Sequence, residues 1–506
     1  MPSPPLTWPS PTGLLAAIDM GSNSFRLEIG QLRDGRYRRQ LYLKETVRLG
    51  AGLDANGLLT EEAALRGLGC LQRFRDSLGG LAPNQVRAVA TQTLREARNR
   101  NAFLERAQAA VGLPIEVISG REEARLIYAG VSHLQPSDDK RLVIDIGGRS
   151  TEMILGRGRV PTQAESFQVG SVSLSMRYFP DGRFTAEAFR AAQVAAGAEL
   201  EEALTVFTPG RWHEALGSSG TAGAVSELLA ANGRSDGRIT PDGLRWLITE
   251  CIRAGSIDAL ALPGLKPERR AVLGGGLAIL YTLATHFRIA ELLPAKGALR
   301  QGVIVDLHDR LLAHQRARGH DMRDDSVQAL QRRFGVDREQ AHRVRELALR
   351  WYAQVEPRAD AERRHELRWA ADLHEVGLMV SHHDHHRHSA YLVAHVDAPG
   401  FSQSQQRRVA DLVLGQRGGL RKVDAVLAHE DTAWQLLCLR LAVIKCHARA
   451  AVDGDALRLQ RQGRSARLRW GPGWADAHPR AVHLLREEAE AWSRSGVLSL
   501  SLPESR

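Results

Sequence analysis

At 506 residues, the chain is too long to fold around one hydrophobic core, and we expect roughly three or four domains. Hydrophobic residues make up 43% and charged residues 25%, proportions that are typical of globular proteins and exclude a disordered or fibrous chain. The formal net charge of +10 favours anionic partners, phosphate compounds or nucleic acid, without choosing between them.

The first residues, MPSPPLTWPSPTG, are rich in proline and have neither a basic start nor an apolar core, so we expect a loose tail and no signal peptide. The longest uncharged stretch, Val272 to Thr285, is shorter than a membrane-spanning helix requires. The four cysteines form no C-x-x-C pair and no metal-binding spacing. Free thiols are typical of a reducing compartment, so we expect a cytoplasmic protein without a membrane span, while attachment to a membrane surface stays open.

Two segments repeat one plan: an apolar strand, an aspartate, a turn of small residues and a second strand. The first is GLLAAIDMGSNSFRLEIG, where Asp19 follows a strand predicted for Leu14 to Ile18, and the second is RLVIDIGGRSTEMILG, with Asp145 at the same place. Taken singly, each copy is no more than a hairpin with an acid in its turn. Together, two such turns can direct N–H groups and hydroxyls at one magnesium phosphate. The pair therefore predicts a duplicated fold with a cleft between its halves.

Between the two copies, predicted strands and helices alternate, which is typical of an α/β region. VRAVATQTLREARN predicts a strand from Val86 to Ala90 that runs into a helix carrying Arg95. In PIEVISGREEARLIYAGV, Ser119 and Glu122 have the spacing of a capping box, which gives Glu122 a structural role. Glu123 has no such role and lies off the apolar face of its helix. It is a candidate general base, although a first-turn glutamate also complements the helix dipole.

Farther along, glycine-rich turns precede helices at HEALGSSGTAGAV and VLGGGLAILY. Beyond Leu311 the strand pattern fades, and residues 320 to 450 are predicted to be helical, with Trp351, Trp369 and Trp434 in the core. The last segment returns to strand, helix and strand, which predicts a small α/β unit.

These motifs together resemble those of the exopolyphosphatase and guanosine pentaphosphate phosphatase family, within the actin-like ATPase superfamily. The resemblance rests on AAIDMGSNSFRL, TQTLREARN, VISGREEARLIYAGV, LVIDIGGRSTEM, GSSGTAGAV and GALRQGV, and LRWAADLHEVGL with HHRHSAYL is similar to the HD-like domain of long bacterial members. It implies an α/β fold of duplicated actin-like (ribonuclease H-like) ATPase domains with a cleft, followed by an all-α HD-like domain and a small C-terminal α/β unit. The expected boundaries are residues 12–130, 131–310, 311–455 and 456–506.

The resemblance also assigns roles to residues. It implies that Glu123 activates the attacking water and that Asp19 and Asp145 hold Mg²⁺, with Glu152 as a further carboxylate near the metal. The expected phosphate contacts are Ser22, Asn23, Arg95, Gly147, Gly148, Arg149, Ser150 and Thr151. These parts suit hydrolysis of a terminal phosphoanhydride, which needs an in-line water, a positioned base and neutralised phosphoryl charge. Mg²⁺, with or without a monovalent cation, is the expected cofactor, and the resemblance implies a homodimer.

Arg149 departs from the family pattern, Asp-x-Gly-Gly-Gly-Ser-Thr, which has a third glycine at its place. Its side chain would either obstruct the approach of a phosphate to the backbone or turn outward and add a guanidinium to the site. Since the rest of the pattern is present, we expect an active site with altered phosphate affinity and not an inactive one.

The HD-like segment departs from its pattern as well. A metal-binding HD pair needs Asp directly after His, and this chain has His374-Glu375. The run HHDHHRHS, with five histidines between His382 and His388, is therefore interpreted as structural or polyanion-binding and not as a centre of metal-dependent hydrolysis.

The sequence leaves four functions open. The favoured one is an exopolyphosphatase that removes terminal phosphate from inorganic polyphosphate, which suits the net charge of +10. The alternative is hydrolysis of the 5′ terminal phosphate of guanosine pentaphosphate (pppGpp), which uses the same parts and needs a guanosine pocket. An actin-like kinase or ATP-driven clamp is disfavoured by the SGREEARLIY element. A non-catalytic polyphosphate-binding or nucleotide-sensing protein has Arg149 as its main support. We expect no specific nucleic-acid partner.

Overall fold

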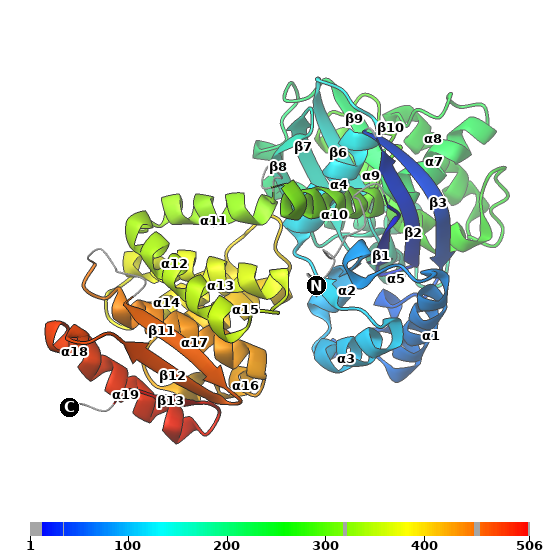
Figure 1. Cartoon of the computed structure of the whole chain (residues 1–506). Helices are drawn as coiled ribbons and strands as arrows, with labels where there is room; N and C mark the ends of the chain where they lie inside the picture. Colours follow the sequence, from blue (N-terminus) through cyan, green and yellow to red (C-terminus); the bar gives the residue numbers. More distant parts are fainter. Residues whose placement is uncertain (1–12, 34, 317–320, 450–455, 504–506) are drawn as a thin grey trace. The chain divides into compact units, whose positions relative to one another are not determined.

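The structure is a computed structural model that describes residues 13–33, 35–316, 321–449 and 456–503. The proline-rich tail expected at the N-terminus lies outside these residues, apart from its last position. The chain divides into two compact units, residues 1–320 and 321–506 (Figure 1). Within the described ranges, no helix is both long enough and apolar enough to cross a membrane.

The first unit contains two lobes, and each is built on a five-stranded sheet of the same topology. The strand order is β3-β2-β1-β4-β5 in lobe I and β8-β7-β6-β9-β10 in lobe II. In both sheets the central strand, β1 or β6, pairs antiparallel with the strand that follows it and parallel with the strand on its other side. This repeat confirms the duplicated fold that the two aspartate-bearing segments predicted.

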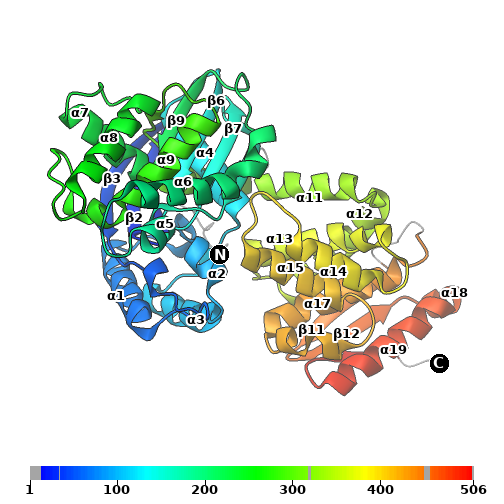
Figure 2. The ribbon, with the colours of Figure 1, turned by 180° about the vertical axis from the view of Figure 1, so that it is seen from behind.

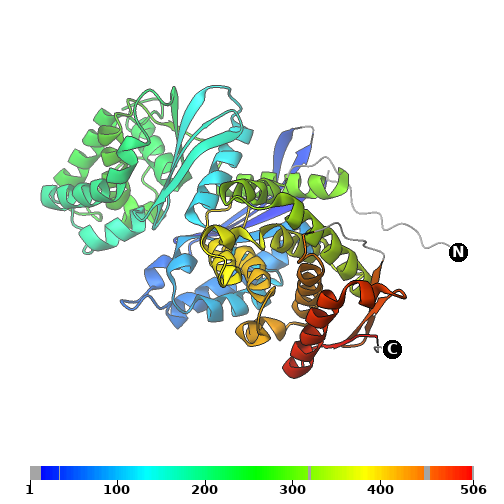
Figure 3. The same ribbon diagram turned by 90° about the vertical axis from the view of Figure 1, so that its left-hand side faces the viewer.

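Lobe I comprises β1 (Leu15–Met20), β2 (Phe25–Arg33), β3 (Arg36–Glu45), α1 (Glu61–Ser77), β4 (Val86–Ala90), α2 (Gln92–Glu96), α3 (Arg100–Val111) and β5 (Ile115–Val117). Lobe II comprises β6 (Lys140–Ile146), β7 (Thr151–Arg157), β8 (Val160–Phe167), α5 (Ser171–Tyr178), α6 (Ala186–Leu200), β9 (Glu214–Ser218), α7 (Ser219–Ala231), α8 (Pro241–Ala254), α9 (Leu273–His286) and β10 (Leu293–Pro294). Helices α5 to α9 lie together on one side of the lobe II strands (Figures 2 and 3).

The central strands are buried on both faces, which explains their continuous apolar sequence. In β1, every residue is buried; Ile18 and Met20 face the core beneath α1 and α3, whereas Leu15 and Ala17 face a core shared by both lobes. A strand covered on both faces has no polar side to show in its sequence, and it therefore lacks the alternation of a surface strand.

Two helices cross between the lobes: α4 (Gly120–Leu134) packs on the sheet of lobe II, and α10 (Leu299–Arg316) packs on the sheet of lobe I. They also pack on each other, and their apolar residues form the core shared by the lobes (Figure 1). The crossing is close because Gly302 of α10 lies against the Leu126 carbonyl of α4, where a Cβ would overlap the oxygen. Both helices begin at the cleft between the lobes, and they carry Glu123 and Arg300 there.

The second unit is helical at first, as predicted, and ends in a small sheet. Its elements are α11 (Met322–Arg333), α12 (Arg338–Val355), α13 (Ala361–Leu373), α14 (His385–His395), α15 (Gln403–Gly415), α16 (Asp424–Leu427), α17 (Glu430–Lys445), β11 (Leu457–Gln462), β12 (Ser465–Trp470), α18 (Trp474–Ala477), α19 (Pro479–Ser495) and β13 (Ser499–Ser501). The three predicted tryptophans, Trp351, Trp369 and Trp434, are fully buried. One continuous core joins the helices, the three strands and α19, so the C-terminal strands and helix pack as part of this unit.

Candidate active site

The two predicted aspartates lie near the ends of the central strands, where the chain turns. Asp19 and Asp145 are both buried. Across the strand pairs, Asp19 lies opposite Arg26 and Asp145 lies opposite Glu152. The turns that follow the two strands meet, since a Cβ on Gly148 would lie 3.3 Å from the Cβ of Ser22. The first unit therefore brings both turns to one place.

A cavity of about 350 Å³ opens between these turns. Of the residues predicted for the site, the lining includes Asp19, Ser22, Asn23, Glu123, Asp145, Gly147, Gly148 and Ser150. The other four predicted residues, Arg95, Arg149, Thr151 and Glu152, are not among the described residues that line it. Eight of the twelve predicted residues, from distant parts of the sequence, thus converge on one cavity.

Glu123 reaches the cavity from the first turn of α4. The hydroxyl of Ser119 accepts a hydrogen bond from the Glu122 N–H at 3.2 Å and so begins the helix, while the Glu122 carboxylate accepts from Arg125 at 2.8 Å. The next residue, Glu123, is directed to the cavity and its Oε2 accepts from Arg95 Nη1 at 2.8 Å. Burial raises the pKa of Glu123 to about 7, an effect that Arg95 opposes. A carboxylate with this pKa is suited to accept a proton near neutral pH.

The second aspartate lies among other buried acids. Burial raises the pKa of Asp145 to about 6. Glu152, whose Oε1 accepts from Ser166 at 2.7 Å, is buried as well, and burial together with Glu123 and Asp145 raises its pKa well above the usual range. Carboxyls gathered in this way are stabilised in the ionised form by a cation.

The first aspartate has cations beside it. Arg26 Nη1 lies 3.1 Å from Asp19 Oδ2, and Arg300 Nη1 lies 3.6 Å from the same oxygen. Arg300 also donates to the buried carboxylate of Glu28 at 3.2 Å, which holds its guanidinium at the start of α10.

Six cationic side chains line the cavity, and sequence reasoning assigned a role to none of them. They are Arg26, Arg39, Lys44, Arg269, Lys296 and Arg300. Three acids line the same cavity, so its lining is net positive. Burial, Arg269 and Arg26 lower the pKa of Lys44, which is the effect expected where cations gather in excess. Arg26 and Arg300 lie within motifs that carried the family resemblance, FRL and GALRQGV, and this was the one available signal.

The predicted residues outside the lining are held by protein contacts. The Thr151 hydroxyl donates to the Val169 carbonyl at 2.6 Å. The Arg149 guanidinium pairs with Glu96 at 2.7 Å and donates to the Gly50 carbonyl at 3.3 Å. The phosphate contacts expected of these residues stay predictions, and the Arg149 side chain is held against Glu96 and Gly50, outside the described lining.

The two strands β1 and β6 supply the carboxylates that could hold a metal ion, Asp19 and Asp145. Within the part of the chain that the structure describes, no three His, Cys, Asp or Glu side chains gather as a protein-only metal site. Mg²⁺ needs no such cage, because it commonly takes one or two carboxylates and completes its shell with water and substrate phosphate. Asp19 and Asp145, two hard oxygen donors on one cavity, fit that pattern.

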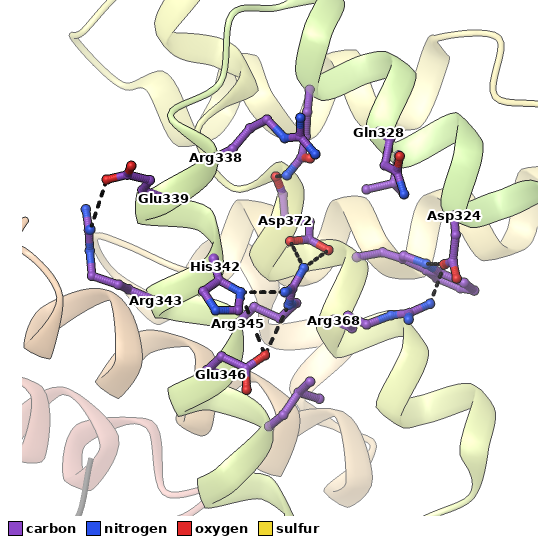
Figure 4. A pocket seen from close by; sticks show the side chains of 14 residues that line it. Asp324, Gln328, Arg338, Glu339, His342, Arg343, Arg345, Glu346, Arg368 and Asp372 are labelled. Atoms are coloured by element: carbon purple, nitrogen blue, oxygen red, sulfur yellow. Dashed lines mark hydrogen bonds and ion pairs between the residues drawn. The ribbon is translucent and has the colours of Figure 1, made fainter. Parts of the chain in front are cut away.

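A larger cavity, of about 850 Å³, lies in the second unit between α11, α12 and α13 (Figure 4). Four arginines and four acids line it, and they pair with one another, as Arg345 does with Asp372 at 3.1 Å and Arg368 does with Asp324. The lining is electrically balanced, unlike that of the cavity in the first unit. Phosphate binding is therefore favoured in the first unit.

The histidine run lies mostly at the start of α14. His385 and His386 are buried there, and burial lowers the pKa of both, that of His386 to about 4. His374 is buried too, with Nδ1 2.7 Å from the Ala371 carbonyl, and burial likewise lowers its pKa. His385 and His386, buried and neutral, fit the structural interpretation of this part of the run, whereas His382 and His383 are exposed.

Known proteins resemble the chain along most of its length. The Ppx/GppA phosphatase family matches residues 34–311, and domain III of that family matches residues 322–489. An exopolyphosphatase from Cytophaga hutchinsonii is 24% identical with a TM-score of 0.54, over 59% of this chain and 98% of that chain. An exopolyphosphatase-like protein is 24% identical with a TM-score of 0.52, over 59% of this chain and 99% of that chain. The two solved structures support the fold. Because the first family match alone covers more than half of the sequence, the chain belongs to the Ppx/GppA phosphatase family.

Proposed function

We propose that the chain is an Mg²⁺-dependent exopolyphosphatase, which hydrolyses the terminal phosphoanhydride bond of inorganic polyphosphate and releases orthophosphate. The observation that carries the proposal is the net positive cavity in which Glu123 lies beside both aspartate-bearing turns. Family membership supports a phosphatase, and the cavity supports a substrate with many negative charges.

The substrate is bound by the two turns and by the cations around them. Backbone N–H groups and hydroxyls at Ser22, Asn23, Gly148 and Ser150 hold the terminal phosphoryl group. The six cationic side chains around the cavity bind the next phosphates of the polyphosphate chain.

Asp19 and Asp145 would hold Mg²⁺. When bound, the ion supplies charge neutralisation at the phosphoryl group that is transferred. The raised pKa of Asp145 supports this assignment, because an ionised carboxylate buried beside other acids gains most from a cation.

Glu123 acts as the general base. Its carboxylate takes a proton from water as the water oxygen bonds to the terminal phosphorus, and the bridging P–O bond breaks with its electron pair left on the shortened chain. The hydrogen bond from Arg95 fixes the Glu123 carboxylate and leaves its other oxygen for the water.

Hydrolysis of pppGpp is the second candidate, and Tyr42 bears on the choice. Tyr42 is the aromatic side chain among the described lining residues, and a guanine base would need such a surface. The guanidinium carbons of Arg39 and Arg300 lie 5.5 Å and 5.1 Å from the centre of its ring. A guanine base beside this ring would share it with two guanidinium groups, and we therefore favour polyphosphate as the substrate.

Release of orthophosphate from polyphosphate, pppGpp and ATP, at equal concentrations of terminal phosphate and with Mg²⁺, tests the proposal. We expect the fastest release from polyphosphate and none after Mg²⁺ is chelated. Faster release from pppGpp would establish the second candidate. Tight binding of polyphosphate without release from any of the three would establish a binding protein instead.

A further inference from the structure

Arg149 belongs to lobe II, yet its side chain is bound to lobe I. Its Nε lies 2.9 Å and its Nη2 lies 2.7 Å from the same oxygen of Glu96, at the end of α2. Its Nη1 donates to the carbonyl of Gly50 at 3.3 Å. A Cβ on Gly50 would lie 2.9 Å from the Arg149 Cδ. Because glycine has no Cβ, the aliphatic part of the Arg149 side chain fits against it.

Glu96 is the first member of a chain of hydrogen bonds that ends at Glu123. The second oxygen of Glu96 accepts from Gln92 Nε2 at 2.6 Å. The oxygen of the Gln92 amide accepts from Arg95 at 2.9 Å and 2.6 Å. Arg95 then donates to Glu123 at 2.8 Å. The Gln92 amide has one orientation that satisfies a carboxylate on one side and a guanidinium on the other, so the order of donors and acceptors is fixed.

We propose that Arg149 is a positioning residue: it neutralises Glu96 and thereby keeps Arg95 bound to Glu123. This inference rests on the proposed role of Glu123 as the general base.

The physical basis is competition between two carboxylates for one guanidinium. Glu96 and Glu123 lie on opposite sides of Arg95, and only the Gln92 amide separates Arg95 from Glu96. Glu96 is partly buried, with 28% of its side chain exposed, and its negative charge needs a partner there. While Arg149 supplies that partner, Arg95 is free to hold Glu123. Without Arg149, Arg95 is a cation that only the Gln92 amide separates from Glu96, and it would be drawn away from Glu123.

The arrangement differs from the two roles expected from the sequence, obstruction and phosphate binding. It gives a reason for an arginine in a turn of small residues, since the guanidinium spans from lobe II to the α2 helix of lobe I. It also ties the base to the geometry of both lobes, because Arg149 reaches Glu96 only when the turns are in contact.

The test compares kcat and KM for polyphosphate in variants that keep the arginine stem. We expect Arg149→Met to lower kcat roughly 10-fold or more with KM little changed, because a misplaced base costs turnover and not binding. Arg149→Lys, which keeps the charge, should retain most of kcat. The decisive variant is Arg149→Met/Glu96→Gln, since removing the competing charge should restore kcat to within about threefold of the unaltered protein.

A kcat that stays low in the double variant, or a change confined to KM, would overturn the proposal. Arg121→Met is the matched control, because it removes an Arg–Glu pair between α4 and Glu165 of β8, which lies outside the chain of bonds. If Arg149→Met does not fold, Arg149→Gln serves in both the single and the double variant. An unaltered protein that releases no phosphate would contradict the proposed function, whereas an active protein with an unaffected Arg149→Met would contradict the positioning role alone.

Discussion

In lobe I, the residue across the strand pair from the aspartate is Arg26, and in lobe II it is Glu152. The strand order and the pairing of the central strands are the same in the two lobes, so this difference is one of charge at matching positions. Asp19 has Arg26 at 3.1 Å, whereas Asp145 lies among buried acids and has a pKa raised to about 6. The cross-strand neighbour therefore gives Asp19 a direct ion-pair partner and places a second acid beside Asp145, whose raised pKa Arg26 and Arg300 oppose only in part.

The asymmetry has a chemical consequence for the cavity. Asp19 has an arginine as its direct partner and Glu123 has Arg95, whereas no ion pair neutralises Asp145 or Glu152 among the described residues. In the proposed function, Mg²⁺ held by Asp145 and Asp19 would supply the positive charge that Asp145 lacks as a direct partner. The duplicated backbone thus carries different charges in its two lobes, although each lobe contributes one aspartate and some cations to the cavity.

The largest expected effect on turnover is at Glu123, which lines the cavity together with Asp19 and Asp145. Glu123→Gln should lower kcat by ~10²-fold or more, with polyphosphate still bound, because the amide cannot accept the proton of water. Phosphate release and equilibrium binding of polyphosphate measure the two halves of this prediction. Glu165→Gln, in β8 and outside the cavity lining, is the control. Near-normal turnover in a folded Glu123→Gln protein would rule out the general base.

The two aspartates should respond in opposite ways to the same change. Without Mg²⁺, Asp19→Asn should destabilise the protein by about 1–3 kcal/mol, because Arg26 loses the carboxylate that it pairs with. Asp145→Asn should stabilise it at neutral pH by about 1–3 kcal/mol, because a buried carboxylate is replaced by a neutral amide.

The sign for Asp145 follows from its pKa. The pKa is about 6 in the folded protein against 3.8 as the ordinary value, so the unfolded chain loses its proton first as pH rises. Stability is therefore lost between these two values, and Asp145→Asn should remove that loss. Urea unfolding with EDTA present, at acidic and neutral pH, measures both variants. Destabilisation of equal size in the two would show that the charge asymmetry is absent.

The pH dependence of turnover tests the environment of Glu123 directly. Its carboxylate must be ionised to act as a base, and burial raises its pKa to about 7, so kcat/KM should fall as pH is lowered through that value. Bound Mg²⁺ favours the ionised form, so saturating metal should move this limb to lower pH. A profile measured at low and saturating Mg²⁺ gives both quantities. A limb that moves to higher pH, or that persists in Glu123→Gln, would assign it to another group.

The local part of this site was predictable from sequence, and the reason is physical. The apolar runs before Asp19 and Asp145 are buried strands, and the small residues after them form turns whatever the rest of the chain does. Ser119 begins α4 through a bond to a residue three positions away, which fixes where Glu123 lies on its helix. Each of these features depends on neighbours in sequence.

The remaining part depends on contacts between distant segments. Arg149 pairs with Glu96 where the turns of the two lobes meet, and Arg300 pairs with Asp19 and Glu28 where α10 packs across lobe I. The Thr151 hydroxyl donates to the carbonyl of Val169, which lies farther along the chain. Spacing along the chain carries no information about such choices.

The smallest expected effect concerns Lys44, and it sharpens the comparison of the lobes. Arg26, Arg39 and Lys44 come from β2 and β3 of lobe I, whereas the matching strands of lobe II, β7 and β8, supply no cation to the described lining. Lys44→Ala should raise KM for polyphosphate about 3–10-fold and leave kcat nearly unchanged. A charge that binds phosphates far from the reacting bond stabilises the ground state and the transition state alike. Its KM should also depend less steeply on salt concentration, since one ionic contact is lost.

Lys140→Ala, at the exposed start of β6, is the control for general charge loss. A fall in kcat equal to the fall in kcat/KM would show that Lys44 acts on the phosphoryl group that is transferred, and not only on the phosphates farther along the polyphosphate chain.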